Sequence, residues 1–202
     1  MRVISGSARG RTLKAVPGMG TRPTTDKVKE AIFSMIGPYF DGGEVLDLFA
    51  GTGGLSIEAL SRGMSRAVLI DADKKALETV RHNLQAAGFA ACAEVYRNDA
   101  VRALKALAKR GKTFDLVFID PPYKMKVIPE LLERLTDGGL LSGRAIVVLE
   151  HDAEDRHDTA YGDLRPTRRA EYGDTAITVY RRLEGLASEE EAEVRGVEDN
   201  GR

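Results

Sequence analysis

Residues 45–55 read VLDLFAGTGGL, a short apolar run followed directly by a glycine-rich turn. An amphipathic stretch then continues to Arg62. A buried strand, a glycine turn and a helix in this order form the entrance of nucleotide-binding α/β domains, where glycines let the backbone approach a ligand closely. Glycine turns join strands to helices in many other folds, so this stretch alone is weak evidence for a nucleotide-binding domain. Other segments of the sequence must support the hypothesis.

Short apolar segments alternate with amphipathic ones along most of the chain. This pattern predicts strands at 44–49, 67–71, 93–97, 114–119, 145–150 and 174–181, and helices at 27–36, 54–63, 73–87, 99–110 and 126–136. The alternation predicts an α/β fold with a parallel sheet covered by helices on both faces. In such sheets the ligand lies at the carboxyl ends of the strands.

Acidic residues follow several of the predicted strands. Asp71 comes about 20 residues after Gly51, a spacing at which a carboxylate can hold ribose hydroxyls. Asp47, just before the turn, could face an ammonium group, and Asp99 could accept from an adenine amino group. For Asp47 and Asp99, helix capping or turn formation is the alternative.

The glycine turn argues against two common cofactor classes. A dinucleotide fingerprint needs a third glycine, but Gly51-Thr52-Gly53 is followed by Gly54, Leu55 and Ser56. The lysine of a phosphate-binding P-loop is also missing. A nucleoside without phosphates fits better. S-adenosylmethionine carries the ribose, the adenine amine and the ammonium group that the three aspartates could recognise.

The segment Asp120-Pro121-Pro122-Tyr123 ends the predicted strand 114–119. The prolines stiffen the backbone and leave the Pro121 carbonyl as an acceptor, while Asp120 adds a second acceptor and Tyr123 an aromatic face. Together they suit a planar amine such as a nucleobase NH2 group. Held there, the nitrogen could attack a methyl sulfonium directly, with catalysis by positioning and polarisation. A rigid turn without function is the alternative.

Residues 1–30 are rich in cations, although the formal net charge of the chain is only −1. Residues 2–14 predict a short basic hairpin, and the helix 27–36 should bury Val28, Ala31, Ile32 and Met35, with Thr24 or Thr25 as its N-cap. Five cations are candidates for phosphate binding: Arg9, Arg11, Arg22, Lys27 and Lys29. Three of them crowd the helix start, where a cation does not favour the helix dipole.

These motifs resemble known proteins. Residues 46–53 together with 120–123 resemble the class I S-adenosylmethionine-dependent amino-methyltransferases. The basic head resembles the bacterial RsmD family, which methylates guanine N2 in 16S ribosomal RNA, and the match extends over about residues 1–182. Lys27 and Lys29 depart from this pattern, since arginines are expected there and lysine lacks the bidentate fork.

The resemblance implies a Rossmann-like, seven-stranded, mostly parallel sheet with an antiparallel last strand. It also implies S-adenosylmethionine as cofactor and 16S rRNA or the small ribosomal subunit, or its assembly intermediate, as partner. The catalytic residues would be Asp120, Pro121 and Tyr123. The cofactor contacts would be Asp47, Phe49, Ala50, Gly51, Gly53, Asp71, Ala72, Asp99, Ala100 and Asp120.

The domain prediction is an RNA-binding extension at 1–40, a methyltransferase domain at 41–183 and an acidic, disordered tail at 184–202. A single cysteine, Cys92, and the lack of a signal peptide or membrane span predict a cytoplasmic protein. We also expect it to be a monomer. No metal site is expected, and His82, His151 and His157 are expected to be structural or surface residues.

Three other functions fit parts of this sequence. The chain could methylate another amine, namely adenine N6 in DNA or a protein glutamine amide, although a glutamine amide would need no basic head. It could be a non-catalytic RNA-binding or ribosome-assembly module that keeps the fold. It could also be a nicotinamide oxidoreductase, which the missing third glycine disfavours.

Overall fold

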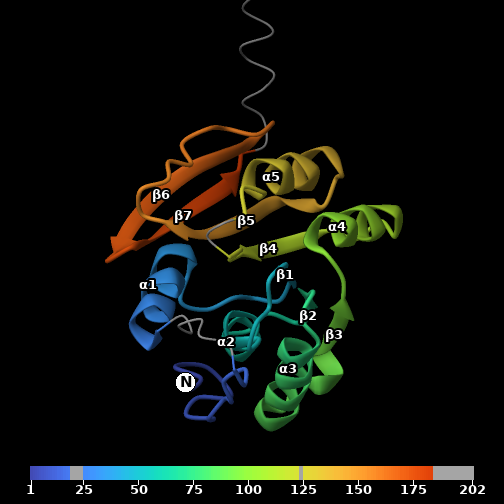
Figure 1. Ribbon diagram of the computed structural model, residues 1–202, viewed down its shortest axis with the longest axis vertical. Coiled ribbons are helices and arrows are strands. Elements are labelled where there is room, and N and C mark those ends of the chain that lie inside the picture. The colour runs from blue at the N-terminus through green and yellow to red at the C-terminus, as the bar shows by residue number, and fades with distance from the viewer. Residues whose placement is uncertain (19–24, 123–124, 184–202) are drawn as a thin grey trace, which may run out of the picture.

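The computed structural model describes residues 1–18, 25–122 and 125–183, and Figure 1 shows its arrangement. The described helices and strands are α1 (Asp26–Ile36), β1 (Glu44–Asp47), α2 (Gly54–Ser61), β2 (Arg66–Asp71), α3 (Lys74–Ala87), β3 (Ala93–Arg97), α4 (Ala100–Lys109), β4 (Phe114–Ile119), α5 (Ile128–Asp137), β5 (Leu141–Asp152), β6 (Leu164–Tyr172) and β7 (Thr175–Arg182), with a 3₁₀ turn at Ala90–Cys92.

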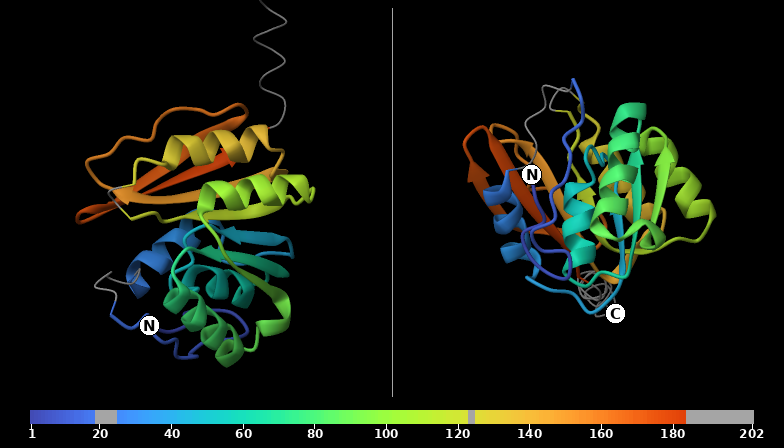
Figure 2. Two further views of the ribbon diagram at one scale, coloured as in Figure 1. Left: turned by 45° about the vertical axis from the view of Figure 1, so that its right-hand side comes forward. Right: turned by 90° about the horizontal axis from the view of Figure 1, so that it is seen from below.

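The strands form one seven-stranded sheet in the order β3-β2-β1-β4-β5-β7-β6. β1 to β5 run parallel, whereas β7 pairs antiparallel with both β5 and β6. Figure 2 shows the twist of this sheet, with β6 and β7 far from β3. The predicted Rossmann-like, mostly parallel sheet with an antiparallel last strand is confirmed.

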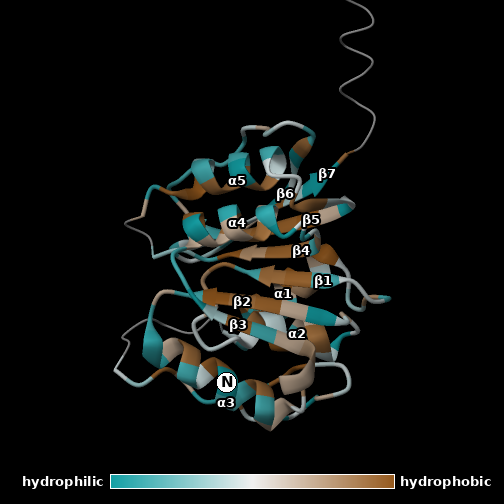
Figure 3. Cartoon of the chain, turned by 90° about the vertical axis from the view of Figure 1, so that its right-hand side faces the viewer, coloured by the Kyte–Doolittle hydropathy of each residue, from teal (hydrophilic) through white to brown (hydrophobic). Residues whose placement is uncertain are grey.

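Helices cover the sheet on both faces, and each face has its own apolar core. α1, α2 and α3 pack on one face through residues such as Phe33, Ile57 and Val80. α4 and α5 pack on the other through Leu104 and Leu132. Figure 3 shows the same division, because the strands are mostly apolar and the helices alternate between polar and apolar residues. No helix of the described segments is long and apolar enough to span a membrane.

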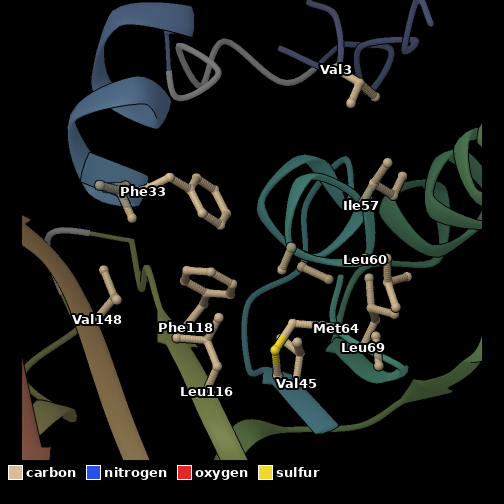
Figure 4. Packing of buried hydrophobic residues seen from close by; sticks show 14 of the residues in the cluster. Val3, Phe33, Val45, Ile57, Leu60, Met64, Leu69, Leu116, Phe118 and Val148 are labelled. Carbon is tan, nitrogen blue, oxygen red and sulfur yellow. The ribbon is translucent and has the colours of Figure 1, made fainter. Parts of the chain in front are cut away.

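The N-terminal segment packs on the first of these faces. Val3, Ala8 and Leu13 are buried in the same core as α1 and α2, and Figure 4 places Val3 above Ile57 of α2. The predicted hairpin forms as a short antiparallel pairing. An Arg2–Thr12 bridge lies between two backbone hydrogen bonds of 2.9 Å, from the Val3 N–H to the Arg11 carbonyl and from the Leu13 N–H to the Met1 carbonyl. The hairpin then packs on the helices through its buried apolar residues.

Gly6 allows this close packing. Its φ is +84°, and a Cβ at this position would lie 1.7 Å from the Ser61 carbonyl oxygen at the end of α2. A side chain there would be strained and would also clash with the helix backbone.

The buried face of α1 differs from the predicted one. Lys29, Ile32, Phe33 and Ile36 are buried, whereas three of the four predicted positions are only partly buried. The real face is rotated by one residue, or about 100° around the axis. Phe33 lies 6.2 Å from Phe118 of β4, ring centre to ring centre, in an edge-to-face contact, which Figure 4 shows. The cap at Thr25 and the helix end at Gly37 agree with the prediction.

The residue pattern alone did not predict β6. This edge strand is largely polar, and its pairing with β7 shifts register between Pro166 and Arg168. Proline cannot donate to a sheet ladder, and an irregular, polar edge strand lacks the alternation by which strands are recognised. β5 is also longer than predicted, because its outer part extends beyond the apolar run at 145–150.

Candidate active site

Four aspartates lie at the carboxyl ends of four adjacent strands. Asp47 ends β1, Asp71 ends β2, Asp99 follows β3 and Asp120 follows β4. In the sheet these strands are neighbours in the order β3-β2-β1-β4. The chain leaves β1 in one direction and returns as β4 on its other side, which is the switch point where α/β sheets bind ligands. The predicted residues thus meet at one edge of the sheet.

The glycine turn is anchored to β2. The Gly51 N–H donates to Asp71 Oδ2 over 2.8 Å, and the Asp73 N–H donates to Asp71 Oδ1 over 2.8 Å. The Ala50 N–H donates to the Ile70 carbonyl over 2.9 Å. Gly51 and Gly53 have φ values of +54° and +76°, a region that favours glycine. Asp71 therefore shapes the loop, and each of its oxygens keeps acceptor capacity for a hydroxyl.

Asp47 is the most enclosed of the four acids. It is 3% exposed, and its Oδ2 accepts from Ser56 Oγ over 3.0 Å. Burial raises the pKa of Asp47 to about 7, although hydrogen bonds from Ser56 and from the backbone at Phe49 oppose this rise. A buried carboxylate whose charge is poorly compensated is suited to a cation.

Asp99 caps α4. Its side chain accepts from the Arg102 N–H over 3.1 Å, as the capping alternative predicts. The carboxylate is nevertheless exposed at the strand end and could accept a further donor. The neighbouring Ala100 is buried, Ala72 is exposed after β2, and Phe49 packs partly against the core.

Asp120 and Pro121 follow β4 immediately. Burial, and then the nearby Glu150 and Asp47, raise the pKa of Asp120 well above its ordinary value. Burial and the two neighbouring acids thus disfavour the ionised form of the Asp120 carboxyl group. Pro121 is buried, whereas the Pro122 carbonyl accepts from the Met125 N–H over 2.8 Å. Tyr123 lies outside the described residues.

A cavity of about 460 Å³ lies beside this turn, lined by Pro121, Pro122, Met125, His151 and His157 among others. His151 bonds to the Asp152 carbonyl and to Thr178 Oγ1, each over 2.8 Å. Because a carbonyl only accepts, Nδ1 carries the proton and Nε2 accepts from the hydroxyl. Burial lowers the pKa of both histidines, so they are neutral near pH 7.

The structure separates the predicted RNA-binding cations. Arg9, Arg11 and Lys27 are exposed, and Arg22 lies outside the described residues. Lys29 is fully buried: its Nζ donates to the Arg2 carbonyl over 2.5 Å and lies 3.4 Å from Glu58 Oε2. The prediction that Lys29 binds RNA is therefore wrong, because a side chain without exposed surface cannot contact a phosphate.

Sequence reasoning missed two buried polar residues near the glycine turn, Glu58 on α2 and Asn83 on α3. Both are fully buried. The sequence does contain a sign that Asn83 is buried, as it does for Lys29. Asn83 lies at helical spacing with Val80, Leu84 and Ala87, which form an apolar face of α3. A polar residue on such a face must have a partner in the fold.

The chain is similar to known proteins over most of its length. The family model described as Conserved hypothetical protein 95 matches residues 1–181. YlbH of Bacillus subtilis is 53% identical over 90% of this chain and 99% of its own length. "Ribosomal RNA small subunit methyltransferase D" of Escherichia coli is 34% identical over 90% of both. The chain belongs to this family, the RsmD family.

Solved structures agree with this membership. The RsmD-family chain matches yhhF of Escherichia coli with a TM-score of 0.77 at 35% identity, covering 90% of this chain and 97% of that one. An RNA methyltransferase from Salinibacter ruber in complex with S-adenosyl-L-homocysteine matches with a TM-score of 0.59 at 20% identity, over 82% of this chain and 96% of that one. This second likeness shows the shared fold alone.

The described segments contain no group of three or more histidine, cysteine, aspartate or glutamate side chains arranged to hold a metal ion.

Proposed function

We propose that this protein transfers a methyl group from S-adenosylmethionine to the exocyclic N2 of a guanine in the 16S rRNA of the small ribosomal subunit. The observation that carries the proposal is the meeting of the glycine turn, Asp47, Asp71 and Asp120 at adjacent strand ends. Family membership supports the substrate, since the Escherichia coli relative is named as a small-subunit rRNA methyltransferase.

The residues fit the cofactor by their chemistry. Asp71 offers acceptors to ribose hydroxyls, and the buried Asp47 offers a carboxylate to the ammonium group. Gly51 and Gly53 let the backbone come close to the ligand. Phe49, Ala50, Ala72, Asp99 and Ala100 would complete the contacts. The cofactor supplies an electrophilic methyl group on a sulfonium.

The turn after β4 would hold the target amine. Asp120 and the Pro121 carbonyl would accept from the two N–H groups, and Tyr123 would stack on the base. This grip turns the nitrogen lone pair toward the methyl carbon. In the transfer, the nitrogen–carbon bond would form as the sulfur–carbon bond breaks, and the nitrogen would lose a proton to water. The protein contributes alignment and polarisation rather than a covalent intermediate.

The exposed cations of the N-terminal extension would bind the RNA backbone. Arg9 and Arg11 lie in the loop that contacts Ser61 at the end of α2, and Lys27 lies in the first turn of α1. We assign phosphate contacts to these three residues and to Arg22. Such contacts position the RNA without reading its sequence, and they would make its affinity fall as salt rises. A base in an RNA loop can reach the site at lower cost than a paired base.

The proposal is tested by transfer of labelled methyl from S-adenosylmethionine to unmodified small ribosomal subunits, followed by nucleoside analysis. We expect the label in N2-methylguanosine. Label in N6-methyladenosine would keep the mechanism and change the base. Bound cofactor without label in subunits, naked rRNA or DNA would contradict the methyltransferase function and favour a non-catalytic assembly module.

Cofactor affinity should depend on pH through Asp47. With its pKa at about 7 in the free protein, the carboxyl binds a proton in acid and then cannot pair with the ammonium group. We expect the affinity for S-adenosylhomocysteine, which keeps that group, to fall below pH 7 and to approach a tenfold loss per pH unit. Titration calorimetry between about pH 5.5 and 8.5 measures this.

The variant Asp47→Asn is the control, since it should bind weakly but with little pH dependence over the same range. Stability should change in the opposite sense. The folded pKa of Asp47 lies above the unfolded value of about 3.9, so this residue lowers the free energy of unfolding as pH rises from about 4 to about 7. If the affinity for S-adenosylhomocysteine depends on pH equally in the variant and in the wild type, a group other than Asp47 is responsible for the titration.

A further inference from the structure

One buried side chain forms hydrogen bonds both to the N-terminal extension and to the glycine turn. Asn83 of α3 accepts from the Lys14 N–H over 2.8 Å and donates to the Lys14 carbonyl over 3.0 Å. Its amide also donates to the Thr52 carbonyl, between Gly51 and Gly53, over 2.9 Å. The Asn83 side chain is fully buried, and every one of these bonds goes to backbone atoms. It thus joins two segments that are distant in the sequence.

A second set of contacts holds the same extension on the helix that begins at the turn. Glu58 of α2 accepts from the Ile4 N–H over 2.8 Å and from the Ser5 N–H over 2.9 Å. Near the end of α2, the Ser61 hydroxyl accepts from the Ala8 N–H over 2.9 Å. Figure 1 shows the N-terminal segment lying against α2. The loop that carries Arg9 and Arg11 is therefore fixed on α2, the helix that begins at the glycine turn.

Among the described residues, Asn83 gives the stronger of two connections between the extension and the glycine turn. The other is a direct contact of Thr52 Oγ1 with Met1 Sδ over 3.9 Å, and a thioether sulfur is only a weak acceptor. The hydrogen bonds that anchor the glycine turn on β2 come from Asp71 and Ile70 of that strand and do not involve the extension. The Thr52 carbonyl instead points to an amide that also bonds the extension through Lys14. If either the extension or the glycine turn moves away, Asn83 loses a hydrogen-bond partner. An unsatisfied buried polar group lowers the stability of that arrangement.

We propose that Asn83 is a positioning residue that couples RNA binding on the N-terminal extension to cofactor binding at the glycine turn. The inference rests on the proposed function. A ligand that fixes the extension favours the arrangement in which Asn83 holds the turn, and a ligand that fixes the turn favours the same arrangement. Each ligand then raises the affinity for the other by the same factor, as linkage requires.

The test measures the dissociation constant of labelled S-adenosylhomocysteine for the full chain, with and without saturating unmodified small ribosomal subunits. We expect the subunits to tighten binding at least about fivefold, within the usual range of coupling between sites. Asn83→Ala should bring this ratio close to one. Asn83→Asp is nearly isosteric and keeps an acceptor for Lys14, but it loses both donors and should give the same result.

Thr79→Val is the matched control. Thr79 is buried one turn earlier on α3, and among the described residues its hydroxyl donates to the Lys75 carbonyl of the same helix and to no other atom. A general loss of α3 stability would affect this variant too, but the coupling ratio should stay at the wild-type value. Thermal unfolding establishes whether each variant is folded. If Asn83→Ala is not folded, the test uses Asn83→Asp.

Two results would contradict this inference and leave the proposed function unaffected. One is wild-type binding with a ratio near one, and the other is a wild-type ratio retained in both Asn83 variants. Failure of the wild type to bind S-adenosylhomocysteine would instead overturn the proposed function, and the inference with it. The binding ratio separates positioning from simple stability, because a purely structural role of Asn83 would weaken binding equally with and without subunits.

Discussion

Replacing Asp120 with alanine is expected to lower the rate of methyl transfer by at least about 10²–10³-fold, the usual cost of removing a hydrogen-bonding group that acts on the reacting atoms. Affinity for the cofactor should remain nearly unchanged although Asp120 is also an expected cofactor contact, because Asp47 and Asp71 offer the carboxylates for its ammonium group and ribose hydroxyls. Asp120 follows β4, where with the Pro121 carbonyl it would hold the target amine. Single-turnover transfer to unmodified small subunits, together with S-adenosylhomocysteine binding, measures the two effects separately.

Asp120→Asn makes this experiment sharper. Burial and the nearby Glu150 and Asp47 raise the pKa of Asp120, so the side chain favours its neutral form. An asparagine resembles that form and keeps a carbonyl acceptor. It should therefore retain much of the transfer rate that alanine loses. If asparagine is as inactive as alanine, the negative charge is required; if both lose cofactor affinity, Asp120 belongs to the cofactor site and not to the base grip.

Much of the catalytic edge could be predicted because its signals are local. The run at 45–55 shows a strand, a turn and a helix in eleven residues, and the four strand-end aspartates follow from counting strands. Parallel topology then brings these ends together without any knowledge of long-range contacts. The glycine turn and Asp120-Pro121 accordingly lie where the pattern places them.

Long-range pairing is what the sequence could not show. Lys29 stands among charged residues at a helix start, a position typical of exposed cations. Its spacing to Ile32, Phe33 and Ile36 indicated the buried face, but its partner Glu58 is 29 residues away. Asn83 and Lys14 are 69 residues apart. Such pairs are formed by tertiary packing, and no local pattern specifies them.

The pairing of Lys29 with Glu58 predicts the largest effect on stability. Glu58 is fully buried, and it accepts from Lys29 over 3.4 Å and from Arg62 Nε over 2.8 Å. Burial lowers the pKa of Lys29, and Glu58 opposes this shift. Removing one partner of a buried ion pair leaves the other charge uncompensated. Glu58→Gln should therefore lower the free energy of unfolding by about 3–5 kcal/mol, measured by urea denaturation.

The chain supplies its own matched control for this prediction. Glu130 and Arg134 of α5 have the same four-residue spacing as Glu58 and Arg62, and their closest charged atoms are 2.9 Å apart, but both side chains are 44–49% exposed. Glu130→Gln should cost no more than about 0.5 kcal/mol, since water and salt screen an exposed pair. Lys29→Met combined with Glu58→Gln should recover part of the loss, because the unpaired ammonium group is then gone. Equal costs for the two glutamine variants would show that burial does not strengthen the Glu58 network, and that the extension is held on α2 by its apolar residues instead.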